Sequence, residues 1–146
     1  MNMVQVYIKG QEDKELSSFL HYYPVRIKNI GMDAFFDRQV IYDFKDGRNH
    51  ADVAKCVAKM LVKVVGERTA VHGTKVKKDE RAKRLKEKNN IEVDANFFKN
   101  KIVCIWDDVV TTGTSFCAYT AQLEQVGAHV TNGIFLGKTS YKYVQQ

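Results

Sequence analysis

Long apolar segments, paired cysteines and metal-ligand spacings are all missing from this chain of 146 residues. No apolar run approaches the ~20 residues of a membrane span, and the N-terminus lacks the apolar core of a signal peptide. The three cysteines, Cys56, Cys104 and Cys117, show no Cys-x-x-Cys spacing and fall within apolar patterns, which predicts reduced thiols in the core. The four histidines are too scattered for a zinc site. We therefore expect a soluble, cytoplasmic protein.

A chain of this length is expected to form one domain, residues 1–146, around a single core. Its net charge of +6 is concentrated in one basic segment, Lys75 to Lys88, which holds eight basic residues against three acidic ones. Three explanations stay open: a solvated surface, attraction of a polyanionic small molecule, or attraction of nucleic acid. The segment has no interleaved aromatic residues that could stack on bases, which makes nucleic acid the less favoured partner.

The most informative stretch is residues 102–128. An apolar run with strand composition comes first, and two adjacent carboxylates follow it, Asp107 and Asp108. A loop of hydroxyl-bearing residues and glycine comes next, and from about Ser115 apolar residues recur at helical spacing. Gly127 stands where this helix should end. The order predicted is therefore strand, acidic turn, threonine and glycine loop, and helix.

This order suits a phosphorylated sugar. In an open α/β sheet, ligands bind at the carboxyl ends of the strands, and a helix start offers free N–H groups with a partial positive charge. A loop of small residues lets these groups converge on a phosphate, and hydroxyls add further donors. Carboxylates suit sugar hydroxyls or a hydrated magnesium ion, so a ribose 5-phosphate satisfies both halves. The alternative, a plain polar turn, requires two carboxylates and three threonines by coincidence.

The nine residues DDVVTTGTS, Asp107 to Ser115, resemble the motif that binds 5-phosphoribosyl 1-pyrophosphate (PRPP) in type I phosphoribosyltransferases. The resemblance implies an α/β fold with a phosphoribosyltransferase-type, mainly parallel sheet flanked by helices and a small N-terminal β hood. It implies that Asp107 and Asp108 hold the ribose hydroxyls and act in catalysis. It assigns the 5-phosphate to Thr111, Thr112, Gly113, Thr114 and Ser115. Mg²⁺ is the implied cofactor, held by phosphates and waters without direct protein ligands.

The reaction that this resemblance implies is attack by a nitrogenous base on the anomeric carbon of PRPP, with loss of pyrophosphate. The alternative is a non-catalytic PRPP- or nucleotide-binding module on the same fold, including a regulator that binds nucleic acid. Many members of the family pair as homodimers, but the sequence leaves both the base and the oligomeric state open. A weaker likeness links residues 40–61, VIYDFKDGRNHADVAKCVAKML, to competence-associated phosphoribosyltransferase-like proteins.

The first half of the chain predicts a small antiparallel β addition followed by a helix. Alternating apolar residues predict three short strands, at Met3–Lys9, Tyr22–Ile30 and Val40–Phe44. Asn49 is expected to cap a helix whose apolar stripe runs to about Val65 and ends at Gly66.

The segment after that helix departs from the family. A type I phosphoribosyltransferase has a further strand there, whose tip binds pyrophosphate, but no strand of the required length is expected between Gly66 and Asn89. Either the protein lacks a pyrophosphate loop, or core residues are missing near Thr69. The residues from His72 to Lys75 are similar to the mobile catalytic loop of orotate phosphoribosyltransferases, with Lys75 favoured because lysine is charged at neutral pH. The alternative is a surface loop that has no function.

After the motif, Val130–Leu136 is expected to form a parallel strand, reached by a right-handed crossover. The residues that follow, Gly137, Lys138 and Thr139, look like the end of a P-loop. That interpretation fails because Asn132 stands where the first glycine is required and no helix is expected next.

Overall fold

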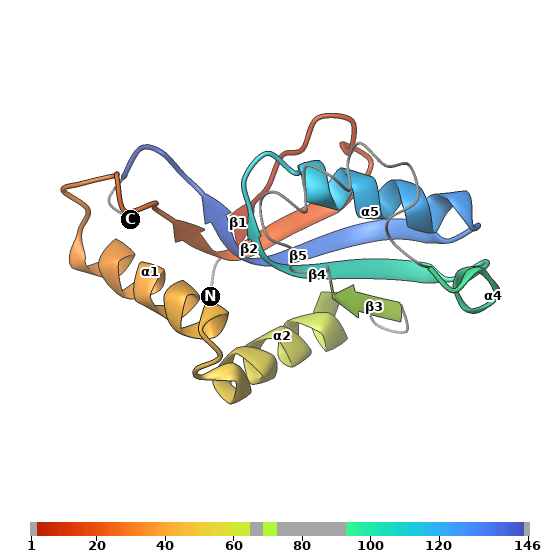
Figure 1. Cartoon of the computed structure of the whole chain (residues 1–146), viewed down its shortest axis with the longest axis horizontal. Helices are drawn as coiled ribbons and strands as arrows, with labels where there is room; N and C mark the ends of the chain where they lie inside the picture. The colour runs from red at the N-terminus through yellow and green to blue at the C-terminus, as the bar shows by residue number, and fades with distance from the viewer. Residues whose placement is uncertain (1–2, 65–68, 73–92, 145–146) are drawn as a thin grey trace.

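The computed structural model describes residues 3–64, 69–72 and 93–144, and its centre is a five-stranded sheet (Figure 1). The strands are β1 (Val4–Gln5), β2 (Glu15–Tyr22), β3 (Thr69–His72), β4 (Ile102–Val110) and β5 (His129–Thr139). Their order across the sheet is β1-β2-β5-β4-β3. All neighbouring pairs run parallel except β1 and β2. The expected α/β class with a mainly parallel sheet is confirmed.

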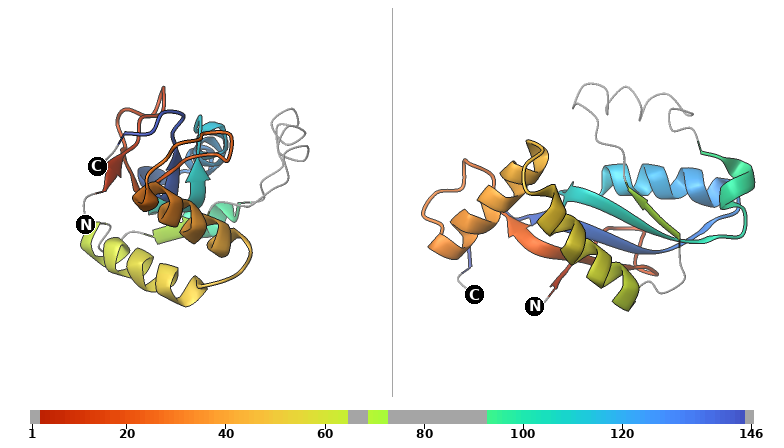
Figure 2. Two further views of the ribbon diagram at one scale, coloured as in Figure 1. Left: turned by 90° about the vertical axis from the view of Figure 1, so that its left-hand side faces the viewer. Right: turned by 90° about the horizontal axis from the view of Figure 1, so that it is seen from below.

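Helices cover both faces of the sheet, which gives three layers (Figures 1 and 2). The helices are α1 (Met32–Lys45), α2 (His50–Val64), α4 (Ala95–Phe98) and α5 (Thr114–Gln125). Helix α5 lies on one face, and α1 and α2 lie on the other. On the α5 side, Phe116 and Leu123 pack on Phe135 of β5, with the two phenylalanine rings 5.8 Å apart. On the opposite side, Ile41 of α1 and Val57 of α2 belong to a second core.

Most predictions for the second half of the chain are confirmed. The strand carries the two carboxylates but runs on to Val110, so the acidic turn expected at Asp107 and Asp108 is wrong. A helix follows the threonine loop, and Gly127 adopts a left-handed φ of 94° just beyond it. Strand β5 is parallel to β4, as a βαβ crossover requires. Gly137, Lys138 and Thr139 lie inside β5 and a non-helical segment follows them, so the rejection of a P-loop is confirmed.

Most of the predicted N-terminal β addition is wrong. Of the first expected strand only Val4–Gln5 is paired, and residues 23–30 form turns instead of a second strand. Residues 40–44 belong to α1 and not to a strand. Their pattern misleads because α1 carries apolar side chains on its exposed side as well as its buried one, which removes the clean helical stripe. The strand that exists here is β2, which pairs in parallel with β5.

Helix α2 is confirmed, but its predicted cap is not. Asn49 has a left-handed φ of 58°, and its Nδ2 donates to Asp43 Oδ2 at 3.5 Å. The end expected at Gly66 lies outside the described residues. The segment before β4 contains α4, where Asp94 accepts a hydrogen bond from the N–H of Phe97 at 3.1 Å.

The sequence predicts no strand of the required length between Gly66 and Asn89, but a short strand of four residues lies there. Strand β3 occupies Thr69–His72 and pairs in parallel with Val103–Trp106 of β4. Four residues are too few for a periodicity signal, and pairing with a distant strand stabilises them. The basic segment, including Lys75, lies outside the described residues, as does the side chain of His72.

The cysteines differ in exposure. Cys104 is buried and Cys117 half-buried, whereas Cys56 is exposed on the outer side of α2, so its predicted place in the core is wrong. Its neighbour Val57 occupies the buried side of the helix instead. Among the helices in the described ranges, none is long and apolar enough to cross a membrane.

Candidate functional site

The parallel strands β2, β3, β4 and β5 all end at the same edge of the sheet, because they share one direction. The predicted ribose and phosphate residues lie at this edge, at the end of β4 and in the loop that leads to α5 (Figure 1). The carboxyl edge of a parallel sheet is where open α/β proteins bind their ligands.

Asp107 and Asp108 are both half-buried in the last part of β4. Asp107 Oδ1 accepts a hydrogen bond from the N–H of Asp108 at 2.8 Å, and Asp108 Oδ1 accepts one from the N–H of Val109 at 2.7 Å. Each carboxylate is therefore oriented by the backbone of the next residue. The two groups are fixed acceptors at the strand end, which suits the hydroxyls of a sugar.

The strand is irregular where the two carboxylates stand. Up to Trp106, alternate residues of β4 face the two cores in turn, Ile105 towards α5 and Trp106 towards α1 and α2. Beyond the carboxylates the order is reversed, because Val109 packs towards α1 and α2 and Val110 towards α5. The alternation of side chains therefore breaks once between Trp106 and Val109, although β4 keeps one register with β5 there and its register shift lies at Val103 and Cys104.

The loop after β4 presents hydroxyls and backbone N–H groups. Thr112 Oγ1 and Thr114 Oγ1 are hydrogen-bonded at 2.9 Å, and both residues are exposed. Gly113 caps the start of α5 in the left-handed conformation, with φ 86°, and no side chain caps the N–H groups of the first turn. These groups are left without partners inside the helix, so they can bind an anion.

Gly113 is buried beneath Ile8, a residue that sequence reasoning missed. Ile8 lies between β1 and β2 and is only 3% exposed. A Cβ added to Gly113 would lie 2.6 Å from Ile8 Cγ2, which is closer than real side chains allow. Glycine is therefore required here for two reasons, its left-handed φ and this close contact. The packing of Ile8 holds the threonine loop in place.

Two neighbouring strands add further polar groups that the sequence analysis did not assign to the site. Thr111 Oγ1 is 2.8 Å from Thr139 Oγ1 at the end of β5. The next residue, Ser140, has its Oγ 2.9 Å from His21 Nδ1 at the end of β2. The Ser140 N–H donates to the carbonyl oxygen of Tyr22 at 2.8 Å. The signal that could have identified them is position at the carboxyl ends of parallel strands: Thr139 ends β5, which pairs with β4, and His21 lies at the end of β2, on the other side of β5.

His21 and Lys138 influence each other electrostatically. Burial lowers the pKa of His21 below its ordinary value, the charge of Lys138 lowers that pKa further, and Asp37 acts in the opposite direction. His21 is therefore held in its neutral form near pH 7. Lys138, which pairs with Val110 across the strands, adds positive charge beside the threonine loop. A positive charge there favours an anionic ligand.

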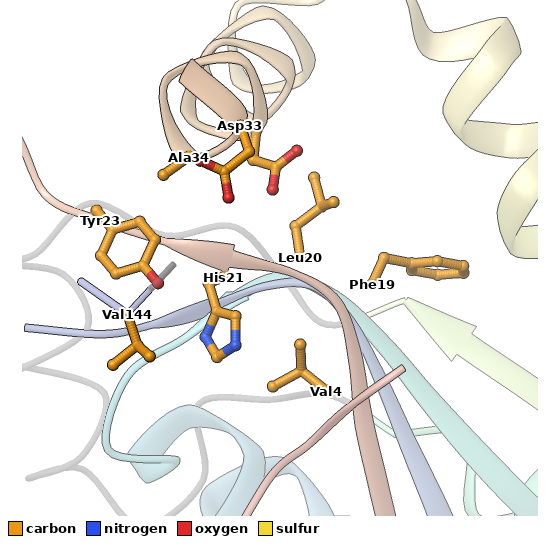
Figure 3. Close-up of a pocket in the computed structure, with 9 residues that line it drawn as sticks. Val4, Phe19, Leu20, His21, Tyr23, Asp33, Ala34 and Val144 are labelled. Carbon is orange, nitrogen blue, oxygen red and sulfur yellow. The ribbon is translucent and has the colours of Figure 1, made fainter. Parts of the chain in front are cut away.

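A small cavity lies beside this edge, between α1 and the end of β2 (Figure 3). His21, Tyr23, Asp33 and Val144 are among the residues that line it. Its volume is about 50 Å³. Ligand pockets usually measure ~300–1,000 Å³, so this cavity suits one or two water molecules and not a nucleotide precursor.

The chemistry of the donors fits a magnesium ion that is held mainly by its ligand. In residues 3–64, 69–72 and 93–144, no group of three or more His, Cys, Asp and Glu side chains is arranged to hold a metal. Asp107 and Asp108 nevertheless offer hard oxygen atoms. Mg²⁺ typically keeps several waters and binds through one or two carboxylates together with substrate phosphates.

Comparison of the chain with models of protein families, with curated proteins and with solved structures finds no match.

Proposed function

We propose that this protein is a magnesium-dependent phosphoribosyltransferase, which transfers the ribose 5-phosphate of PRPP to a nitrogenous base and releases pyrophosphate. One observation carries the proposal. The DDVVTTGTS stretch stands at the carboxyl end of a central parallel strand and leads into a helix that begins at a left-handed glycine. The carboxylate acceptors of Asp107 and Asp108 are thereby separated along the chain from the hydroxyl and N–H donors of the threonine loop. The two ends of a ribose 5-phosphate require such a separation.

In the proposed reaction the two carboxylates act on the ribose and the loop acts on its phosphate. Asp107 and Asp108 accept hydrogen bonds from the ribose hydroxyls and stabilise the positive charge that develops on the ring as pyrophosphate departs. Thr111, Thr112 and the first N–H groups of α5 hold the 5-phosphate and so fix the anomeric carbon. When bound, Mg²⁺ offsets the negative charge of the leaving pyrophosphate.

Strand β3 bears on the choice between transfer and binding alone. The resemblance implies a strand between the first core helix and the motif, with a pyrophosphate-binding tip, and β3 lies between α2 and β4 in the chain and beside β4 in the sheet. The expected lack of a pyrophosphate loop is the main support for a module without chemistry, and the residues after His72 that would form this tip lie outside the described residues. The non-catalytic and nucleic-acid-binding alternatives become outcomes of the experiment below.

The experiment is a pyrophosphate-release assay with PRPP, magnesium and a panel of purine and pyrimidine bases. We expect release with one class of base, and a loss of turnover of about 10²–10³-fold in Asp108→Asn, because a preorganised charge is removed from the transition state. Asp52→Asn, which changes an exposed carboxylate in the first turn of α2, is the matched control and should keep full turnover.

Other results would redirect the proposal. Normal turnover in a folded Asp108→Asn variant would contradict the assigned role of this carboxylate. Magnesium-dependent PRPP binding without release for any base would point to the non-catalytic module. Binding to nucleic acid that weakens steeply with salt, without PRPP binding, would favour the regulator.

A further inference from the structure

Two half-buried side chains at the carboxyl edge of the sheet, His21 and Ser140, hold neither the ribose nor the phosphate in the proposed function. His21 Nδ1 lies 2.9 Å from Ser140 Oγ. In the tautomer that carries its proton on Nε2, the imidazole accepts this hydrogen bond from the Ser140 hydroxyl. The pair is therefore a hydroxyl with a proton acceptor behind it, which is an arrangement that general base chemistry uses.

Both side chains are held in place by their neighbours. The Ser140 N–H donates to the carbonyl oxygen of Tyr22 at 2.8 Å, which ties the end of β5 to the end of β2. The His21 ring stacks on the ring of Tyr23, with the centroids 6.0 Å apart and the planes at 28° (Figure 3). Tyr23 is itself buried. The hydrogen bond between His21 and Ser140 is thereby supported from both sides, as a proton relay requires.

The charges around His21 let it take up a proton and release it again. Burial and Lys138 of β5, which pairs with His21 across the strands, favour the neutral ring, whereas Asp37 of α1 favours the protonated ring. Tyr23 and Asp33 are the other titratable groups that line the cavity beside His21. The pKa of His21 lies below its ordinary value, so the ring is free to accept a proton near pH 7. The phosphates of bound PRPP would offset the charge of Lys138 and make the ring a better acceptor.

The pair lies on the side of β4 from which a base can attack PRPP. Thr139 Oγ1 is 2.8 Å from Thr111 Oγ1 in the threonine loop, and Ser140 is the next residue after Thr139. Strand β5 lies on one side of β4, and β3 lies on the other. In a displacement the nucleophile approaches the anomeric carbon opposite the leaving group, so a base on the β5 side sends pyrophosphate towards β3. This is the strand to which the proposed function assigns pyrophosphate.

We propose that Ser140 and His21 form a relay that removes the proton from the attacking nitrogen of the base. The inference rests on the proposed function and deepens it. The bond from the nitrogen to the anomeric carbon forms while the bond from that carbon to pyrophosphate breaks, and its electron pair leaves with pyrophosphate. The N–H proton passes to Ser140 Oγ as the hydroxyl proton passes to His21 Nδ1. The imidazolium then loses this proton to water.

The relay also assigns the class of base. It serves a ring nitrogen that bears hydrogen, as in purines and pyrimidines, because such a nitrogen loses its proton when it attacks. A pyridine nitrogen has no hydrogen to lose, and the positive charge of its pyridinium product would be unfavourable beside Lys138. We therefore expect pyrophosphate release with a purine or a pyrimidine, and none with pyridine carboxylates.

The test is the pH dependence of pyrophosphate release in the parent chain, in His21→Gln and in Ser140→Ala. General base catalysis contributes ~10²–10⁴-fold, so both variants should lose turnover by about that factor at pH 7 while PRPP binding stays unchanged. The loss should shrink as the pH rises, because the ionised base no longer needs the relay. Towards low pH, kcat/KM should fall more steeply in the parent chain than in His21→Gln. Phosphate groups of the substrate also titrate there, so the chains are compared at each pH.

Two controls separate the relay from packing. Ser140→Thr keeps the hydroxyl and should keep most of the turnover. His129→Gln is the matched control for the histidine, because His129 is exposed at the start of β5, on the opposite edge of the sheet. This control should keep the turnover and the pH profile of the parent chain. In addition, the pKa of His21 measured by NMR should rise when PRPP and magnesium saturate the parent chain.

Three results would overturn the relay and leave the proposed function standing. They are full turnover with an unchanged pH profile in His21→Gln, release with a pyridine carboxylate alone, and a His21 pKa that does not respond to bound PRPP. A parent chain that binds PRPP but releases no pyrophosphate with any base would overturn both the relay and the proposed function.

Discussion

The substitution Gly113→Ala tests whether the contact between Gly113 and Ile8 holds the threonine loop in place. In Gly113→Ala the new methyl group would meet Ile8 Cγ2 at 2.6 Å, while the backbone must keep a φ of 86°. Ile8 is buried and belongs to the α5-side core, so it has little room to move away. The substitution should therefore destabilise the fold and displace the loop.

The magnitude follows from two separate costs. A left-handed conformation costs a residue with a Cβ about 1–2 kcal/mol. Forcing an additional methyl group into a packed core costs about 1–3 kcal/mol. The expected loss in free energy of unfolding is therefore about 2–5 kcal/mol, which leaves most domains of this size folded at room temperature.

Gly47→Ala separates the two costs. Gly47 has nearly the same φ, 83°, but no atom within 4 Å of an added Cβ. Urea denaturation should show a loss of about 1–2 kcal/mol for this control, and about 1–3 kcal/mol more for Gly113→Ala. A double-mutant cycle with Ile8→Ala should recover that additional part as a coupling energy. Equal losses for Gly113→Ala and Gly47→Ala would refute the argument that Ile8 holds the loop.

Two further predictions concern the neighbouring strands. Thr139→Val keeps the shape of a buried side chain but removes its hydrogen bond to Thr111. The free energy of unfolding, measured by thermal or urea denaturation, should therefore fall by about 0.5–1.5 kcal/mol. No change would show that the two hydroxyls do not pair. Because burial and Lys138 lower the pKa of His21, the unfolded chain takes up the proton first as the pH falls below 6.5, and stability should decrease there. His21→Gln should flatten that part of the stability-against-pH curve, and an unchanged slope would contradict the assignment.

The second half of the chain was predictable from its sequence because local and tertiary signals agree there. The apolar run before Asp107 is the centre of β4, the helix predicted from about Ser115 begins at Thr114, and Gly127 follows its end. Thr139 and His21 were not assigned to the site because only the strand order places Thr139 beside the loop and His21 one strand further away. The sequence alone does not show the order of the strands across the sheet.

The first half misled for physical reasons. Strand β2 contains Ser17 and Ser18 between apolar residues, and Ser18 is fully buried because its Oγ donates to the carbonyl oxygen of Leu20 at 2.8 Å. A buried serine with an internal partner leaves no apolar alternation to detect. Helix α1 was hidden for the opposite reason, since its exposed side also carries large apolar residues, Met32, Phe35, Phe36 and Val40.

If the proposed function is correct, the end of β4 and the threonine loop bind PRPP. Calorimetric titration of PRPP into the parent chain, with and without magnesium, alongside Gly113→Ala and Gly47→Ala, tests this binding. We expect saturable binding that needs magnesium, survives in Gly47→Ala and is weakened in Gly113→Ala. The absence of any PRPP binding by the folded parent chain, or equal binding by both variants, would contradict it.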